Sequence, residues 1–167
     1  YVILRDIPFG QDGDFSRAAL KNRFNADLAN DLGNLLNRTL ALVNRLFAGT
    51  LPQPHPEETA LAATTATAYD RATAALDDLR LNEALEAVWT AVSAGNKYID
   101  DRAPWALHKA GDTDRAGGVL YAVLDTLRSI ALMVRPTMPH VAAAIWDQLG
   151  IATPLADARW QDAREPG

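Results

Sequence analysis

The sequence predicts an all-α fold, a helix bundle of five to six helices. Apolar residues recur every three or four positions over several long segments, which is the spacing of one helix face. Alanine, leucine and valine dominate the chain, whereas glycine and proline gather in a few short clusters between these segments. Because no segment shows a strand-period core, we expect the 167 residues to form one domain of helices packed on helices.

The longest predicted helix lies near the start of the chain. Residues 1–15 are interpreted as an apolar, extended stretch that ends in the turn FGQDGDF. Ser16 is placed to cap a short helix ending near Phe24, and Asn25 to cap a longer helix ending near Phe47. The segment AGTLPQPHP then stops that helix. Its apolar stripe is expected to contain Phe24, Leu28, Leu32, Leu35, Leu42, Val43 and Leu46.

Two further helices are predicted in the middle of the chain. The first, from about 57 to 79, is rich in alanine and threonine, so neighbouring helices can approach it closely. Its acidic residues Glu57 and Glu58 suit the positive end of a helix dipole. The second begins with Asn82 as its N-cap and ends near Arg102. Its inward residues are predicted to be Leu85, Val88, Trp89, Val92 and Ile99.

Two more helices and a tail complete the chain. One helix is predicted from Asp112 or Thr113 to Val134, where RPTMP breaks it. The last helix spans 139–149, and the loop-like tail is expected to pack through Trp160. The predicted parts are a linker or stem-contact remnant at 1–15, a helical domain at 16–150 and a C-terminal tail at 151–167.

Composition and charge exclude several classes of protein. Sixteen basic against 21 acidic residues leave a net charge of −5, so any contact with RNA must be local rather than general. The absence of cysteine excludes disulfides, thiolate metal ligands and a cysteine nucleophile, and a reducing cytoplasm is the simplest compartment. No apolar run approaches the roughly 18 to 20 residues that span a bilayer. The start, YVILRDIPFG, does not resemble a signal peptide, and we interpret it as the cut edge of a longer polypeptide.

The titratable residues do not form a recognisable catalytic or metal site. None of the three histidines, His55, His108 and His140, has a glutamate three residues before it, as a di-metal site in a bundle requires. Adjacent carboxylates on a helix point about 100° apart and cannot flank one substrate atom. The glycines in AGG at 116–118 lack a preceding strand, so close helix packing is expected there rather than phosphate binding. The carboxylate pairs interpreted as solvated or helix-end charges are Glu57/Glu58, Asp77/Asp78 and Asp100/Asp101.

A polar stripe on the first long helix is the clearest candidate for binding. Residues 30, 34, 38, 41 and 45 advance by three or four positions and share one face opposite the leucines. Amide and guanidinium groups offer donors, and the amide also offers an acceptor, at fixed positions on a rigid helix. That combination suits hydrogen bonding to a base edge. The alternative is a solvated face with helix–helix hydrogen bonds, and the sequence leaves both open.

A second candidate lies in NKYIDDRAPWALHK, residues 96–109. Trp105 directly follows Pro104 just past a predicted helix end, with several cationic side chains nearby. A tryptophan in such a turn either fills the core or offers its indole face to an unpaired base. Stacking of one base is worth roughly 1 to 3 kcal/mol and does not require a basic protein.

Four motifs, in this order, resemble the C-terminal, anticodon-binding part of bacterial methionyl-tRNA synthetases: IPFGQDGDFS, FNADLANDLGNLLNR, NKYIDDRAPW and RPTMPHVAAAIWDQLG. The resemblance covers about residues 1–150 and implies a helix bundle of the class I anticodon-binding type. It implies that Asn34 and Arg38 hydrogen-bond the first base of the CAU anticodon. It also implies that Trp105 stacks on that part of the loop and that Arg45 contacts the loop.

The resemblance further implies that this chain alone is not catalytic. The His-Ile-Gly-His-type and Lys-Met-Ser-Lys-Ser motifs of the family's active site are absent. No cofactor is therefore expected here, and ATP and methionine would bind the catalytic domain. The implied partners are the anticodon loop of tRNA and the catalytic domain of the same polypeptide, with no membrane. The alternatives are the corresponding domain of an isoleucyl, valyl, leucyl or cysteinyl synthetase, or a helical protein-interaction module.

Overall fold

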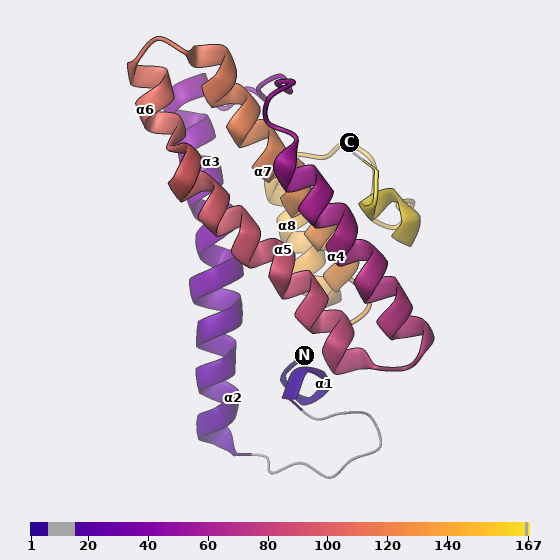
Figure 1. The fold of residues 1–167 in the computed structure, drawn as a ribbon. Coiled ribbons are helices and arrows are strands. Elements are labelled where there is room, and N and C mark those ends of the chain that lie inside the picture. Colours follow the sequence, from indigo (N-terminus) through magenta and orange to yellow (C-terminus); the bar gives the residue numbers. More distant parts are fainter. Residues whose placement is uncertain (7–15, 166) are drawn as a thin grey trace.

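The structure, a computed structural model, describes residues 1–6, 16–165 and 167, and all of its regular elements in those ranges are helical. Figure 1 shows the helix α7 in the middle of the bundle, with the others arranged around it. The all-α prediction is thus confirmed. The elements are α1 (Val2–Asp6), α2 (Arg17–Arg23), the π-helix η1 (Phe24–Gly33), α3 (Asn34–Phe47), α4 (Ala60–Asp77), α5 (Leu81–Arg102), α6 (Pro104–Lys109), α7 (Thr113–Val134), α8 (Pro139–Gln148) and the 3-10 helix η2 (Trp160–Ala163).

The helices α2, η1 and α3 form one continuous rod along the side of the bundle (Figure 1). Both flanks of the π-helix, Arg23 and Asn34, have right-handed helical backbone angles, so the predicted break with Asn25 as a cap is wrong. A π-helix winds with a longer period than an α-helix and shifts the faces of its residues. The predicted stripe consequently fails at Phe24, which is 54% exposed, but holds for buried Leu35 and Leu42.

The first residues of the chain are helical rather than extended. The ring of Tyr1 lies 4.9 Å from that of Trp89, and its hydroxyl donates a hydrogen bond to Asp27. Arg5 forms an ion pair with Glu86 at 2.8 Å. A helix as short as α1 is not stable by itself, so these tertiary contacts explain why periodicity did not predict it. The predicted turn FGQDGDF lies outside the described residues.

The two middle helices are present but begin at other residues than predicted. The proline-rich segment continues to Thr59, so α4 begins at Ala60 and Glu57 and Glu58 precede the helix. The helix α5 begins at Leu81, which places Asn82 inside the first turn rather than at the cap. The predicted inward residues of α5 are all buried: Leu85, Val88, Trp89, Val92 and Ile99.

The helix α7 has the predicted bounds and forms the centre of the core. Asp112 caps it by accepting a hydrogen bond from the backbone N–H of Arg115 at 3.3 Å. By length and composition this helix could cross a membrane, contrary to the expectation that no apolar run is long enough. Most of that span is buried inside the bundle, as is usual for the core helix of a globular protein. Packing on all sides therefore accounts for its apolar character.

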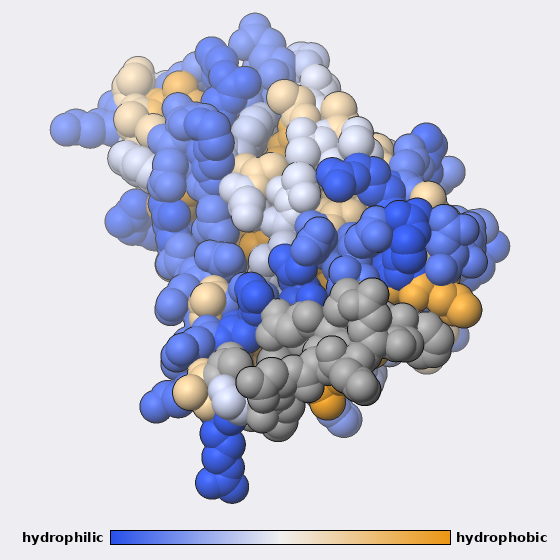
Figure 2. Space-filling view, turned by 60° about the horizontal axis from the view of Figure 1, so that its bottom comes forward, coloured by the Kyte–Doolittle hydropathy of each residue, from blue (hydrophilic) through white to orange (hydrophobic). Residues whose placement is uncertain are grey.

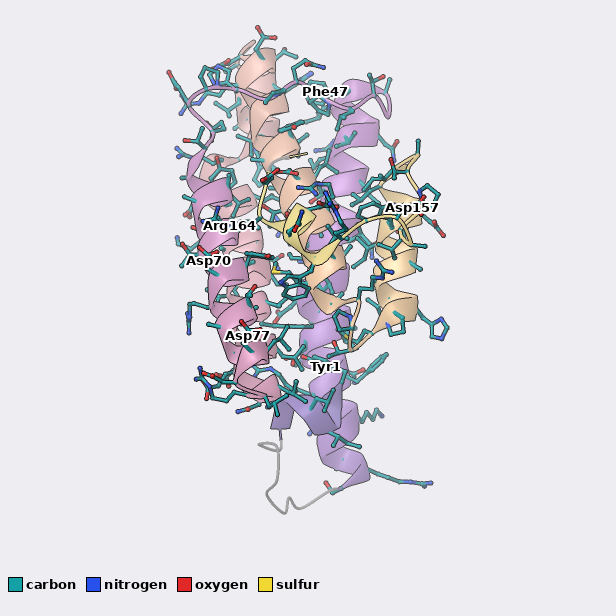
Figure 3. All side chains as sticks on the ribbon, turned by 90° about the vertical axis from the view of Figure 1, so that its right-hand side faces the viewer. Tyr1, Phe47, Asp70, Asp77, Asp157 and Arg164 are labelled. Atoms are coloured by element: carbon teal, nitrogen blue, oxygen red, sulfur yellow. The ribbon has the colours of Figure 1, made fainter. Side chains whose placement is uncertain are left out.

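The C-terminal tail packs on the bundle through Trp160, as predicted. The indole Nε1 donates a hydrogen bond to Thr73 Oγ1 at 2.9 Å, and its ring lies 5.6 Å from that of Tyr69. Arg164 lies beside Asp70 of α4 (Figure 3), with an Nε–Oδ1 distance of 2.8 Å. The tail is thus joined to α4 by both an aromatic contact and an ion pair.

Close packing explains the two glycines at 117 and 118. A Cβ atom on Gly118 would overlap the Cβ of His55 and would lie 3.1 Å from the His55 backbone nitrogen. We expect Gly118→Ala to lower the free energy of unfolding by about 1 to 3 kcal/mol, because the backbone of the segment before α4 must shift. Urea unfolding followed by circular dichroism measures this change. The exposed control Ser93→Ala is expected to stay within about 0.5 kcal/mol, and equal stability of both variants would contradict close packing at Gly118.

Candidate nucleic-acid interface

The polar stripe of the first long helix faces away from the core and lies beside α5. Asn34 and Arg45 are exposed and Arg38 is half-buried, whereas Leu35 and Leu42 on the opposite face are buried. The helical spacing of three and four residues therefore places the stripe as predicted. Asn34 is the first residue of α3, where the π-helix gives way to α-helix.

Hydrogen bonds connect Asn34 to α5. Its Nδ2 donates to Oδ1 of Asn96 at 3.3 Å. Asn96 Nδ2 in turn donates to the backbone carbonyls of Asp31, at 3.1 Å, and Val92, at 3.3 Å. The Asn34 amide is thus linked through Asn96 to the backbone of two helices.

Arg38 is paired with a carboxylate of α5. Its Nη2 lies 2.5 Å from Asp100 Oδ1, and the Asp100 side chain is largely exposed. The neighbouring Asp101 pairs with Lys97 at 2.7 Å. Exposed pairs of this kind contribute about 0 to 1 kcal/mol, so a ligand that offers better acceptors can replace Asp100 at low cost. The stripe was predicted either to hydrogen-bond a base edge or to be a solvated face with helix–helix hydrogen bonds. These alternatives are compatible, since Asn34 and Arg38 bond to α5 and are also accessible.

Trp105 is not a core residue, which contradicts one of the two alternatives for it. The chain leaves α5 at Ala103, whose φ of +43° is left-handed, and α6 then begins with the buried Pro104. Trp105 follows on the outside of this corner and is 40% exposed. Its indole is accordingly available for stacking.

The helix α6 lies against the end of α3 (Figure 1). The rings of Phe47 and His108 meet edge to face at 5.9 Å. Arg45, in the last turn of α3, is exposed, and no hydrogen-bond or ion-pair partner for it lies among the described residues. The fold therefore brings Trp105, from a different helix, to the same end of the molecule as Arg45.

A buried carboxylate beneath this end of the molecule was missed by the sequence analysis. The side chain of Glu58 is fully buried, contrary to its interpretation as a solvated charge, whereas Glu57 is exposed. Its two oxygens lie 2.9 Å from Arg115 Nε and 3.3 Å from Arg102 Nε, and Tyr98 donates its hydroxyl hydrogen bond. Glu58 thus joins the segment just before α4 to the end of α5 and the start of α7. Adjacent identical residues offer no sequence signal for which one is buried.

The environment keeps Glu58 ionised. Burial alone would raise its pKa, but the hydrogen bonds from Tyr98 and Arg115 and the charges of Arg102 and Arg115 outweigh burial and lower the pKa. Burial and the same hydrogen bond raise the pKa of Tyr98 to about 12. Glu58, Tyr98, Arg102 and Arg115 therefore form a charged, hydrogen-bonded cluster. Arg102, its member at the end of α5, directly precedes Ala103, the corner after which Trp105 lies.

Within the part of the chain that the structure describes, histidine and carboxylate side chains do not gather into groups of three or more that could hold a metal ion. The four predicted residues Asn34, Arg38, Arg45 and Trp105 present an amide, two guanidinium groups and an indole. These groups can hydrogen-bond and stack on a nucleic-acid base.

Comparison with known proteins identifies the family. A family model for the anticodon binding domain of methionyl tRNA ligase matches residues 50–166, and a model for class I (M) tRNA synthetases matches residues 1–40. A methionine–tRNA ligase of Caldanaerobacter subterraneus subsp. tengcongensis is 42% identical over 159 residues, which cover 93% of this chain and 25% of the relative. A methionine–tRNA ligase of Synechocystis sp. is 44% identical over 154 residues, which cover 90% of this chain and 29% of the relative.

Solved structures agree with the sequence relatives. The apo form of Mycobacterium tuberculosis methionyl-tRNA synthetase superposes with a TM-score of 0.89 at 35% identity, covering 100% of this chain and 35% of that chain. The form of that enzyme bound by methionyl-adenylate superposes with a TM-score of 0.88 at 35% identity, and the match covers 100% of this chain and 34% of that chain. The chain therefore spans about a quarter to a third of the length of these relatives. The resemblance predicted from the four motifs is confirmed, and the chain belongs to the family of anticodon-binding domains of methionyl-tRNA ligases.

Proposed function

We propose that this chain recognises the CAU anticodon of methionine tRNA, as part of an enzyme that attaches methionine to tRNA in the cytoplasm. The observation that carries the proposal is the exposed indole of Trp105. It lies at the end of the bundle that also carries Arg45, and α6, which contains it, packs on α3. The helix α3 also carries the accessible side chains of Asn34 and Arg38. A base of the anticodon loop stacks on the indole. Asn34 and Arg38 hydrogen-bond the edge of the first anticodon base, and Arg45 contacts the loop.

The charge of the chain limits how tightly the anticodon loop binds. Few cations face the proposed site, and Asp100 and Asp101 lie beside them. Because phosphate contacts supply most of the salt-dependent affinity for nucleic acids, we expect weak binding that is best seen at low salt. Selectivity then comes from base contacts, each worth about 1 to 3 kcal/mol of discrimination.

We also propose that the opposite end of the molecule packs against the catalytic part of the same polypeptide, which binds ATP and methionine. Tyr1 and Phe47 mark these two ends in Figure 3. Near Tyr1 an apolar groove is lined by Ile3, Phe24, Leu28 and Val141, and both Ile3 and Phe24 are exposed. Hydrophobic residues lie between hydrophilic ones on this end (Figure 2). Residues 1–40, which include much of this groove, match the class I (M) synthetase model.

A fluorescence titration at low salt tests the proposed recognition. The tryptophan emission of the chain is followed while a short stem-loop with the anticodon CAU is added, and a GAU loop serves as the control. We expect the CAU loop to quench the emission and to bind at least about tenfold more tightly than the GAU loop. Equal binding of the two loops, or no binding of either, would contradict the proposal.

A further inference from the structure

Asn96 occupies a position that fixes the direction of two amide groups. It lies on α5 opposite the junction between the π-helix and α3. It contacts the carbonyl oxygens of Asp31 and Val92 on one side and the amide of Asn34 on the other. The resemblance gives Asn96 no role, although it belongs to the motif NKYIDDRAPW.

The hydrogen-bond partners determine which way the Asn96 amide points. A carbonyl oxygen can only accept, so the end of Asn96 that faces Asp31 and Val92 must be the NH2 group. Its Oδ1 therefore faces Asn34, and Asn34 must in turn present its own NH2 group to that oxygen. The Oδ1 of Asn34 is then the end of this amide that is directed away from α5.

The π-helix contributes to this arrangement. The carbonyl of Asp31 already accepts the backbone N–H of Asn34, and Asn96 adds a second donor to the same oxygen. A carbonyl has two acceptor lone pairs, so both bonds can form together. The carbonyl oxygen of Asp31, at the end of the π-helix, therefore holds the backbone N–H of Asn34 directly. Through Asn96 it also orients the side-chain amide of Asn34.

We propose that Asn96 is a positioning residue that turns the Asn34 amide so that its Oδ1 reads the first anticodon base. This inference rests on the proposed function. Cytosine carries an amino group on the edge where uracil carries a carbonyl oxygen. An outward-facing acceptor on Asn34 bonds the amino group of cytosine and is repelled by the carbonyl of uracil. Asn96 thereby makes the site selective for CAU over UAU.

Two substitutions of Asn96 separate orientation from stability. Asn96→Ala removes the acceptor for Asn34, so the freed amide can turn to suit either base. Asn96→Asp keeps an acceptor for Asn34 but places a carboxylate against two carbonyls, which is unfavourable. We expect Asn96→Ala to lose the preference for CAU, and Asn96→Asp to keep it while unfolding at a lower temperature.

The experiment measures the dissociation constants of CAU and UAU stem-loops for the chain and its variants, with circular dichroism to verify folding. The native chain is expected to prefer CAU by about tenfold, and Asn96→Ala to bind the two loops within about twofold of each other. Lys97→Ala, an exposed change on the same helix, is the control and should leave the ratio unchanged.

Several results would overturn the inference. A tenfold preference retained by Asn96→Ala, or lost by folded Asn96→Asp, would show that Asn96 does not set the orientation. A native chain that separates CAU from GAU but not from UAU would also overturn it, while leaving the proposed function in place. Equal binding of CAU, GAU and UAU would contradict the proposed function and this inference together.

Discussion

Trp105→Ala is expected to weaken binding of the CAU stem-loop by about 5- to 150-fold, the equivalent of the roughly 1 to 3 kcal/mol of one stacked base. The stability of the fold should change little, because the indole is 40% exposed and Pro104, which is buried, still begins α6. Binding is measured by fluorescence or by calorimetry, and stability by thermal unfolding. The quenching that accompanies binding should disappear with the indole.

Two further variants make the effect of Trp105→Ala specific. Trp105→Phe keeps an aromatic face and should retain part of the affinity. Trp160→Phe changes a tryptophan that packs on Tyr69, so it should leave both binding and quenching intact. If Trp105→Ala unfolds the chain, or if it binds CAU as tightly as the native chain does, the indole is not the stacking platform.

Glu58→Gln, which removes the charge of this buried carboxylate, is expected to lower the free energy of unfolding by about 3 kcal/mol. Removing one partner of a buried ion pair leaves charges without compensation, which typically costs about 3 to 5 kcal/mol. The lower end applies here because the Arg102 and Arg115 side chains are 37% and 33% exposed and keep part of their hydration. Chemical unfolding at neutral pH measures the difference from the native chain.

The same substitution should change the dependence of stability on pH. The folded state holds the pKa of Glu58 below its ordinary value, so the unfolded chain binds this proton more readily. The contribution of Glu58 is therefore fully present above the ordinary glutamate pKa of about 4.3 and is lost as the pH falls through the lower, folded value. The difference in stability between the native chain and Glu58→Gln should consequently shrink as the solution is acidified below about pH 4.

Glu57→Gln provides a matched control for Glu58→Gln. Glu57 is next in the chain, is largely exposed and reaches Arg115 at 3.5 Å. An exposed pair contributes about 0 to 1 kcal/mol, so this variant should be nearly as stable as the native chain and should keep its pH dependence. Equal losses in the two variants would show that the burial of Glu58 has no energetic consequence.

Much of the architecture and of the candidate site followed from local patterns. The core of α5 and both ends of α7 agreed with the predicted helices, because their apolar residues keep the α-helical period and Asp112 is a good cap. The motifs around Asn34 and Trp105 predicted the family. The helical spacing of Asn34, Arg38 and Arg45 placed them on one face directed away from the core, since neighbours on a helix face are determined by sequence separation.

Other features depended on residues that are distant in sequence. The continuity of α2, η1 and α3 and the helical start at α1 required contacts with other helices, which outweighed the local preference of Asn25 for a cap. The burial of Glu58 rather than Glu57, and the exposure of Trp105 rather than its burial, were decided by how α4, α5 and α7 meet.

The sequence alone therefore determined the family, the main helices and the polar face, because these depend on short-range order along the chain. Only the tertiary structure decided which of two adjacent carboxylates is buried, on which side of the corner Trp105 lies, and how Asn96 faces Asn34. The physical reason is that burial and hydrogen-bond direction are properties of pairs of residues. Asn34 and Asn96 are 62 positions apart, and only the packing of α3 against α5 brings their amides within 3.3 Å.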